Sequence, residues 1–133
     1  MEKVFHVEIL TPYGKYLSTD ADYLSVKSGN GVLGILPHHA PLITNIEICK
    51  LVIKSGSETL KYAVGGGLMN IKEGTKVVLL VNSIERSDEI DVSRAEKAKD
   101  RAEKRIKEGD ADVIRAKAAL ARALNRISVH EDL

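Results

Sequence analysis

The sequence predicts an α+β protein: an N-terminal antiparallel β-sandwich of about ten strands, followed by a C-terminal antiparallel hairpin of two helices. Near residue 90 the spacing of apolar residues changes from every second position to every third or fourth. All but one of the ten glycines and all three prolines lie before that point, whereas Ala, Lys, Arg and Glu dominate after it. We therefore place a β-sandwich domain in residues 1–88 and a helical hairpin in residues 89–133.

Short strands are predicted throughout the first part. Residues 5–9 alternate between apolar and polar side chains, as expected for a half-buried strand. The aliphatic runs at residues 51–53 and 77–81 have the length of strands in a sandwich. Glycine and proline separate such pieces at several predicted turns, including Pro12-Tyr13-Gly14, Gly29-Asn30-Gly31 and Gly65-Gly66-Gly67.

Two helices are predicted after residue 90. Asp91 is placed to cap the first, and Gly109 and Asp110, together with Asp112, mark a stop and a restart. The short connection predicts an antiparallel hairpin whose facing side chains are mostly alanine. At about 0.8 kcal/mol per buried CH₂, an alanine seam is weak, so we expect a marginal hairpin that can open. Its apolar positions are Val92, Ala95, Ala98, Ala102 and Ile106, then Val113, Ala116, Leu120, Ala123 and Ile127.

Composition disfavours several classes of protein. The net charge is +1, with a balance of −2 over residues 1–91 and +3 over residues 92–133, which favours neither nucleic acid nor a membrane surface. Aromatic residues make up 4% of the chain, too few for a base-stacking platform. Cys49, the only cysteine, lies in an apolar run and is interpreted as a buried small hydrophobe. We expect neither a signal peptide nor a membrane-spanning segment.

Two local patterns resemble a dinucleotide-binding site and a metal site, but their surroundings argue against both. Residues 29–34 satisfy GxGxxG, yet Pro37 and Pro41 prevent the helix that a dinucleotide site requires, so these glycines are interpreted as hairpin-turn residues. His38 and His39 are adjacent, and on an extended segment they point to opposite sides, so we expect no metal site. No nucleophile, base and orienting group can be assembled from sequence motifs, and we expect no catalytic activity.

Arginines follow one face of each predicted helix. Arg94 and Arg101 are seven residues apart, as are Arg115 and Arg122, and Arg126 lies one turn further. Folding the hairpin brings Arg94 level with Arg126, where guanidinium groups could bind phosphate. A solvated basic face is the alternative. A nucleic-acid-binding hairpin is another, although interspersed acidic residues and the small net charge disfavour it.

Four segments together resemble the epsilon subunits of bacterial F-type ATP synthases. They are residues 31–42 (Gly31-Val32-Leu33-Gly34-Ile35-Leu36-Pro37-His38-His39-Ala40-Pro41-Leu42), 63–67, 90–95 and 122–127. The resemblance implies a non-catalytic central-stalk subunit that docks on the gamma subunit and the ring of c subunits. It also implies helices that can extend towards the alpha and beta subunits and block ATP hydrolysis, and a peripheral location on the cytoplasmic face of the cell membrane. Subunit contacts are expected at Gly29, Asn30, Gly31, His38 and His39.

One of these segments is similar to a nucleotide-binding motif. Ile90-Asp91-x-x-Arg94-Ala95 resembles the motif with which some family members bind ATP, alone or with Mg²⁺, without hydrolysing it. The resemblance implies adenine contacts from Glu85, Ile90, Asp91 and Ala95. It implies phosphate contacts from Arg94, Arg101, Arg122 and Arg126. The chain departs from the family pattern at His38, Leu68 and Asn70.

Overall fold

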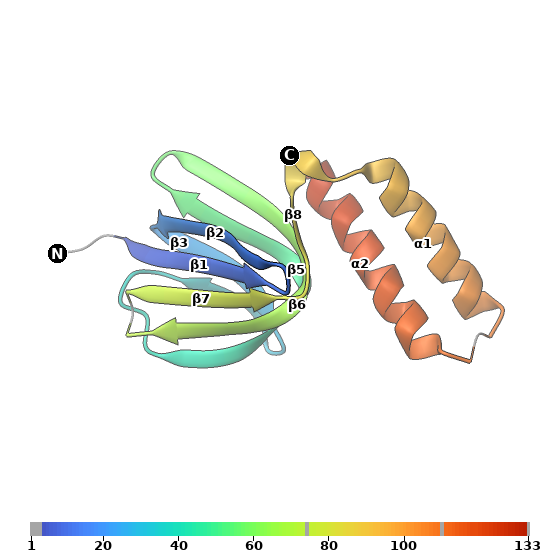
Figure 1. The fold of residues 1–133 in the computed structure, drawn as a ribbon, viewed down its shortest axis with the longest axis horizontal. Helices are drawn as coiled ribbons and strands as arrows, with labels where there is room; N and C mark the ends of the chain where they lie inside the picture. The colour runs from blue at the N-terminus through green and yellow to red at the C-terminus, as the bar shows by residue number, and fades with distance from the viewer. Residues whose placement is uncertain (1–3, 74, 110, 133) are drawn as a thin grey trace.

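The computed structural model describes residues 4–73, 75–109 and 111–132, and it confirms the predicted fold class. A β-sandwich and a helical hairpin lie side by side, with α2 next to the sandwich and α1 on the far side of α2 (Figure 1). The elements are β1 (Phe5–Thr11), β2 (Gly14–Ala21), β3 (Tyr23–Ser28), β4 (Gly31–Ile35), β5 (Leu42–Ser55), β6 (Glu58–Lys72), β7 (Lys76–Val81), β8 (Ile84–Arg86), the 3₁₀ turn η1 (Ser87–Glu89), α1 (Val92–Lys107) and α2 (Val113–Glu131).

The described residues form eight strands rather than about ten. Along the sheet the order is β2-β1-β7-β6-β5-β3-β4, and β8 pairs with β6. The count is lower because β5 and β6, of 14 and 15 residues, run unbroken along the sandwich. Different parts of β6 have different neighbours: residues 67–72 pair with β7 and residues 62–64 with β8.

One strand pair corrects the prediction of a wholly antiparallel sandwich. β1 pairs with β2 antiparallel but with β7 parallel, from His6 opposite Lys76 to Leu10 opposite Leu80. Alternation of apolar side chains has the same period in both kinds of pair, so it carries no information on strand direction. The sheet is therefore mixed.

The three consecutive glycines correct a second prediction, because they lie inside β6 instead of in a turn. A Cβ added to Gly67 would lie 2.0 Å from the carbonyl oxygen of Leu80 and 2.8 Å from the Cα of Val81. A Cβ added to Gly65 would lie 2.2 Å from Oγ of Ser83. Gly67 must be glycine because neighbouring backbone approaches closely, and Gly66 because its φ is +91°. Local sequence cannot distinguish either requirement from that of a turn.

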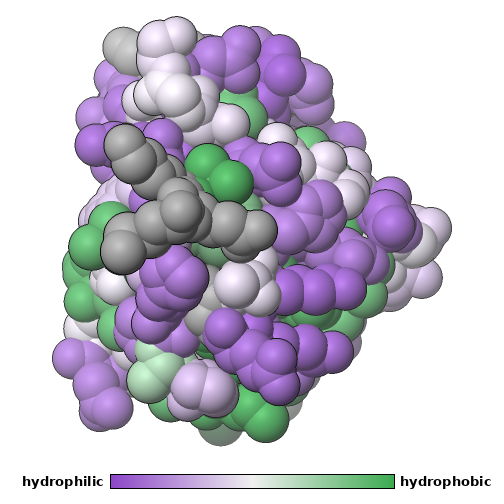
Figure 2. Space-filling view, turned by 90° about the vertical axis from the view of Figure 1, so that its left-hand side faces the viewer, coloured by the Kyte–Doolittle hydropathy of each residue, from purple (hydrophilic) through white to green (hydrophobic). Residues whose placement is uncertain are grey.

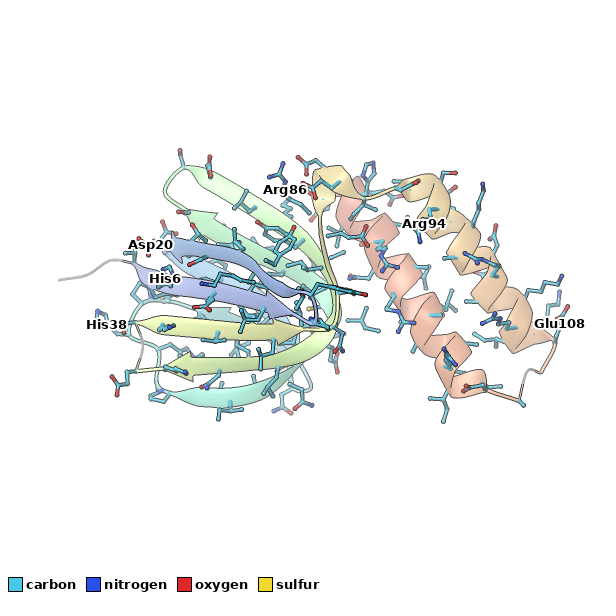
Figure 3. All side chains as sticks on the ribbon, in the orientation of Figure 1. His6, Asp20, His38, Arg86, Arg94 and Glu108 are labelled. Atoms are coloured by element: carbon cyan, nitrogen blue, oxygen red, sulfur yellow. The ribbon has the colours of Figure 1, made fainter. Side chains whose placement is uncertain are left out.

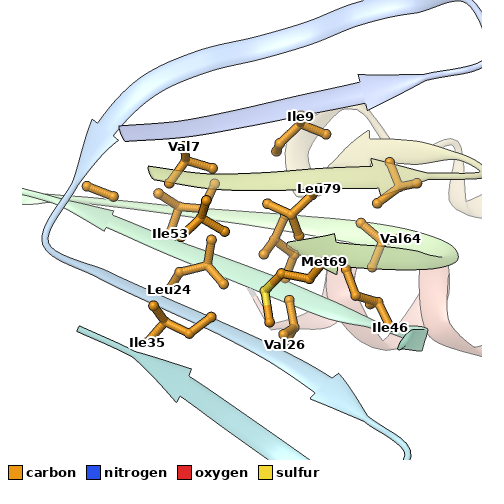
Figure 4. Close-up of a cluster of buried hydrophobic side chains, with 14 of the residues drawn as sticks. Val7, Ile9, Leu24, Val26, Ile35, Ile46, Ile53, Val64, Met69 and Leu79 are labelled. Atoms are coloured by element: carbon orange, nitrogen blue, oxygen red, sulfur yellow. The ribbon is translucent and has the colours of Figure 1, made fainter. Parts of the chain in front are cut away.

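The main core belongs entirely to the strands. Its buried side chains come from residues 5–81 of the sequence. Figure 4 shows that they converge from strands on both sides of the sandwich. Each fully buried apolar side chain contributes about 1.5–3 kcal/mol relative to its exposed state. The largest of them are Phe5, Ile9, Leu24, Ile35, Leu51, Ile53, Met69, Ile71 and Leu79.

Truncation after Asp88 is expected to leave a folded sandwich, because every residue of the main core is retained. The fragment should unfold in one cooperative thermal transition and keep a β-rich circular dichroism spectrum. Full-length protein measured under the same conditions is the control. A molten or insoluble fragment would contradict the two-part architecture.

The helical hairpin begins, turns and packs as its sequence predicts. Oδ1 of Asp91 accepts a hydrogen bond from the backbone N–H of Arg94 at 3.0 Å, and Asp112 caps α2 through Arg115 at 3.2 Å. Gly109 ends α1 with a φ of +70°, a conformation that favours glycine, while Asp110 lies outside the described residues. The buried seam is mostly alanine: Ala95, Ala102, Ala116 and Ala123.

The C-terminal half of α2 fastens the hairpin to the sandwich. Val129, 1% exposed, packs with Ala63 and Ile90 in a small apolar cluster that is separate from the main core. Nδ2 of Asn125 donates to the carbonyl oxygen of Cys49 at 2.8 Å. Asp132 forms ion pairs with Lys50 and Lys61. The pKa of its carboxyl group is lowered, and the largest cause is the hydrogen bond from Lys50.

Two smaller predictions are confirmed. Cys49 is buried, and burial raises the pKa of its thiol, as expected for an unreactive side chain. The GxGxxG segment forms the turn between β3 and β4, where Gly31 has a φ of +114°, and then continues as a strand. No phosphate-binding helix N-terminus follows it.

Candidate functional site

A cleft of about 440 Å³ opens between the two helices and the segment that connects β8 to α1. It lies at the end of the hairpin where α1 begins, next to Arg94 in Figure 3. Three parts of the chain contribute to its lining: residues 85–91 from β8 to the start of α1, residues 94–101 of α1, and Arg126 in the second half of α2. The lining residues are Glu85, Glu89, Asp91, Arg94, Ala95, Ala98, Arg101 and Arg126.

Helical spacing explains why α1 presents arginine and alanine to the same cleft. Arg94, Ala98 and Arg101 are four and three residues apart, so they share one face of the helix. Ala95 and Ala98 lack long side chains, which leaves room between the two helices. Arg126 reaches the cleft from α2, across the alanine seam.

The cleft contains three guanidinium groups and three carboxylates. Nε of Arg126 lies 2.5 Å from Oε1 of Glu85, and both side chains are partly exposed. Among the described residues, neither Arg94 nor Arg101 forms an ion pair within 4.0 Å. Nε of Arg101 donates only to the carbonyl oxygen of Lys97, at 3.4 Å. Two cationic forks therefore remain available to an anion.

Most of the residues implied for ATP binding meet in this cleft. Glu85, Asp91, Arg94, Ala95, Arg101 and Arg126 all line it. Ile90 is close in sequence but buried in the small apolar cluster with Ala63 and Val129, where it positions the start of α1. Arg122 is half-buried and is not among the lining residues.

Two lining residues were not predicted. Ala98 stands four residues after Arg94, so the helical period that identified the arginines also places it on this face. Glu89 lies in the 3₁₀ turn before α1, where no periodic signal exists. Together with Glu85 and Asp91, it makes the site less basic than the arginine spacing alone suggested.

The residues expected to contact other subunits lie in loops of the sandwich. Gly29 and Asn30 form the β3–β4 turn, and Gly31 begins β4. His38 has a φ of +68°, so its segment turns instead of extending as predicted, and Nδ1 of His39 lies 2.7 Å from the carbonyl oxygen of Ala40. His38 lies at the end of the sandwich away from the helices (Figure 3), and Figure 2 views the molecule from that end, where hydrophilic and hydrophobic side chains are mixed.

A second surface, which the sequence did not indicate, lies on the outside of the sheet. In the cross-strand row, Leu10 of β1 is opposite Leu80 of β7, and Leu80 is opposite Leu68 of β6. Leu80 is 46% exposed and Leu68 39%, and Ile43 on β5 is 66% exposed. We call Leu10, Ile43, Leu68, Val78 and Leu80 the outer-face patch. Asn70 lies between Ile43 and Val78, so the patch is apolar with a polar interruption. A group of exposed apolar side chains on an outer sheet face indicates a protein contact.

The chain is similar to ATP synthase subunits over its whole described length. Residues 4–87 match the family described as "ATP synthase, Delta/Epsilon chain, beta-sandwich domain", and residues 88–131 match "ATP synthase, Delta/Epsilon chain, long alpha-helix domain". The ATP synthase epsilon chain of Desulforamulus reducens is 41% identical over 133 residues, covering 98% of this chain and 100% of that protein. The epsilon chain of Nitratidesulfovibrio vulgaris is 43% identical over 132 residues, covering 97% of each.

Solved structures show the same fold at low sequence identity. A chain of the Euglena gracilis mitochondrial ATP synthase superposes with a TM-score of 0.85 at 16% identity, covering 94% of this chain and 80% of that one. A chain of the Tetrahymena thermophila mitochondrial ATP synthase central stalk and c-ring superposes with a TM-score of 0.63 at 15% identity, covering 98% and 96%. Within the described residues, no helix is both long and apolar enough to cross a membrane.

Proposed function

Because the chain belongs to the family of ATP synthase epsilon chains, which are non-catalytic subunits of that complex, we propose that it is a coupling and regulatory subunit of the central stalk. In this role the sandwich contacts the gamma subunit and the c-subunit ring, and so couples the catalytic head to the ion-driven rotor. The helices, when extended towards the alpha and beta subunits, inhibit ATP hydrolysis. The complex holds the subunit peripherally at the cytoplasmic face of the cell membrane.

The outer-face patch supports the contact with gamma. Its leucines come from three adjacent strands, so the backbone fixes their arrangement, and their burial in a complex would remove apolar surface from water. The turn residues Gly29 to Gly31 and the His38–His39 segment offer further contacts at the loops.

Leu80→Glu is expected to weaken binding to gamma at least tenfold without unfolding the sandwich, because Leu80 is exposed in the free subunit but would bring a charge into the interface. Binding of the full-length variant to purified gamma subunit is the measurement. Val32→Glu, at an exposed site on β4 outside the outer-face patch, is the matched control. Equal binding of both variants would place the gamma contact elsewhere.

Inhibition by the helices has a direct test with the chain truncated after Asp88. An enzyme assembled with this fragment should remain coupled through the sandwich but hydrolyse ATP faster than the enzyme with the full chain. Assembly is verified by co-purification. Equal hydrolysis under conditions that inhibit the complete enzyme would contradict a regulatory role for α1 and α2.

The regulatory ligand proposed for the cleft is ATP. The observation that carries this proposal is the pair of guanidinium groups, Arg94 and Arg101, that line the cleft without an ion pair in the described chain. A polyphosphate can use both forks and reach Arg126 on the other helix. Carboxylates of Glu85 and Asp91 at the same cleft can accept hydrogen bonds from the adenine amino group.

ATP bound in this way would hold the hairpin closed, because the arginines that it bridges come from both helices. A ligand at a hundred times its dissociation constant stabilises the form that it binds by about 2.7 kcal/mol. That amount is comparable with a weak alanine seam. Nucleotide concentration could therefore decide between the folded and extended helices.

Arg94→Ala is expected to weaken MgATP binding by about 1.5–3 kcal/mol, the usual contribution of a hydrogen bond to a charged group. Isothermal titration of the isolated full-length subunit measures the effect. Arg94 is exposed and forms no ion pair with any residue that the structure describes, so its replacement should leave the fold unchanged. Arg126→Ala, in contrast, also removes the ion pair to Glu85. Arg105→Ala, on the same helix but outside the cleft, is the control.

Two outcomes would contradict the nucleotide proposal. The first is absence of binding at millimolar MgATP, which would leave the arginines to contacts with other subunits. The second is an equal loss of MgATP affinity in the Arg94→Ala and Arg105→Ala variants, which would indicate a general effect of positive charge.

A further inference from the structure

The outer face of the β1–β2 hairpin brings together a serine, a histidine and an aspartate that the proposed function does not use. β1 and β2 pair in a register that sets His6 opposite Asp20. Side chains alternate between the two faces of a strand, and Phe5 and Val7 point into the core, so His6 points outward. Ser18 and Asp20, two residues apart on β2, share that face, and Figure 3 shows His6 and Asp20 next to each other.

The three side chains form a continuous hydrogen-bonded chain. Nε2 of His6 lies 2.7 Å from Oγ of Ser18, and Nδ1 of His6 lies 3.1 Å from Oδ1 of Asp20. In the tautomer that satisfies both contacts, Nδ1–H donates to the carboxylate and Nε2 accepts the serine hydroxyl proton. This order of hydroxyl, imidazole and carboxylate is the one in which a serine oxygen becomes a nucleophile.

The backbone imposes this arrangement. The strand register fixes the three Cα atoms, and the register itself is held by inward residues, including Ala21 in the core and Leu17 packed against it. The side chains of His6 and Asp20 are 41% and 68% exposed, and Ser18 is exposed as well. A reagent in water can therefore reach the hydroxyl group.

We propose that Ser18 is a nucleophile activated by His6, and that small activated esters acylate it. Oγ of Ser18 forms a bond to the acyl carbon while its proton moves to Nε2 of His6. The bond from the acyl carbon to the leaving oxygen then breaks, and the leaving group takes the electron pair and, where basic enough, the proton. Asp20 holds the imidazole in the required tautomer. The trio lies on an open, exposed strand face, so the site selects esters by reactivity and not by shape.

The probe is p-nitrophenyl acetate, applied to the full-length subunit at mildly alkaline pH, with the acetyl group located by peptide mass spectrometry. General-base assistance typically accelerates a reaction by about 10²–10⁴. At this open site we expect the lower end, with Ser18 acetylated about 100-fold faster than a serine without a histidine partner. Ser57, exposed in the β5–β6 turn of the same molecule, is that internal reference.

Two variants test whether Ser18 reacts because His6 activates it or only because its hydroxyl group is exposed. His6→Gln should lower acetylation of Ser18 to the rate of Ser57, and Asp20→Asn should give an intermediate rate. All these side chains are exposed, so unchanged circular dichroism is the expected check on folding. The proposal is overturned if Ser18 reacts no faster than Ser57, or if its rate survives His6→Gln. The trio would then serve only to fasten β1 to β2.

Discussion

Gly67→Ala is expected to unfold the sandwich or to lower its free energy of unfolding by at least about 4 kcal/mol, the range reached when a core cannot relax around a substitution. A Cβ at this position would lie 2.0 Å from the carbonyl oxygen of Leu80 and 2.8 Å from the Cα of Val81. Both are backbone atoms, so no rotamer change relieves the contact, and β6 and β7 must separate. The φ of +158° is one that L side chains rarely adopt, so backbone strain adds to the cost of the contact.

Chemical denaturation of the full-length Gly67→Ala variant measures the decrease in the free energy of unfolding. Gly29→Ala is the matched control, because a Cβ there meets nothing within 4 Å. It should change stability by no more than about 0.5 kcal/mol, as surface substitutions usually do. A Gly67→Ala variant as stable as this control would mean that β6 and β7 are further apart than described.

Val129→Asp is expected to release α2 from the sandwich while leaving the sandwich folded. Val129 is 1% exposed and packs against Ala63 and Ile90. An unpaired carboxylate there would cost several kcal/mol if it stayed buried. The hairpin is attached by one small cluster and a few polar contacts, so undocking is the less costly response.

Hydrogen exchange, measured peptide by peptide, distinguishes release of α2 from general destabilisation of the sandwich. Protection should fall along α2 and at the start of α1 but persist in β1, β6 and β7. Leu124→Asp, on α2 but 47% exposed, should preserve protection throughout. Loss of protection in the core strands of the Val129 variant would show that the sandwich depends on the hairpin for its stability.

Sequence patterns predicted those features that depend on local chemistry. The caps at Asp91 and Asp112 fix where α1 and α2 begin, and both can be recognised because an aspartate precedes a helical period. Gly65 to Gly67 show the opposite case. The role of Gly67 depends on the backbone of Leu80 and Val81 in β7, at least 13 residues later in the chain, which no local pattern encodes. The parallel pairing of β1 with β7 is missed for the same reason.

In the candidate site, too, the sequence predicted the arrangement within each helix but not the contacts that depend on tertiary packing. Helical period aligned Arg94 with Arg101, and folding of the hairpin brought Arg126 to them. The pairing of Arg126 with Glu85 depends on how α2 packs against the sheet. The trio of His6, Ser18 and Asp20 requires the exact strand register, which alternation alone leaves open.

The position of β1 between β2 and β7 determines when the protein can fold during its synthesis. The β1–β2 hairpin leaves the ribosome first, but its inward residues Phe5, Val7 and Ile9 wait for partners on β7, some 70 residues later. Until residue 81 has emerged, the nascent chain exposes an apolar face that a chaperone can recognise. The helices are synthesised last, after every strand of the sandwich.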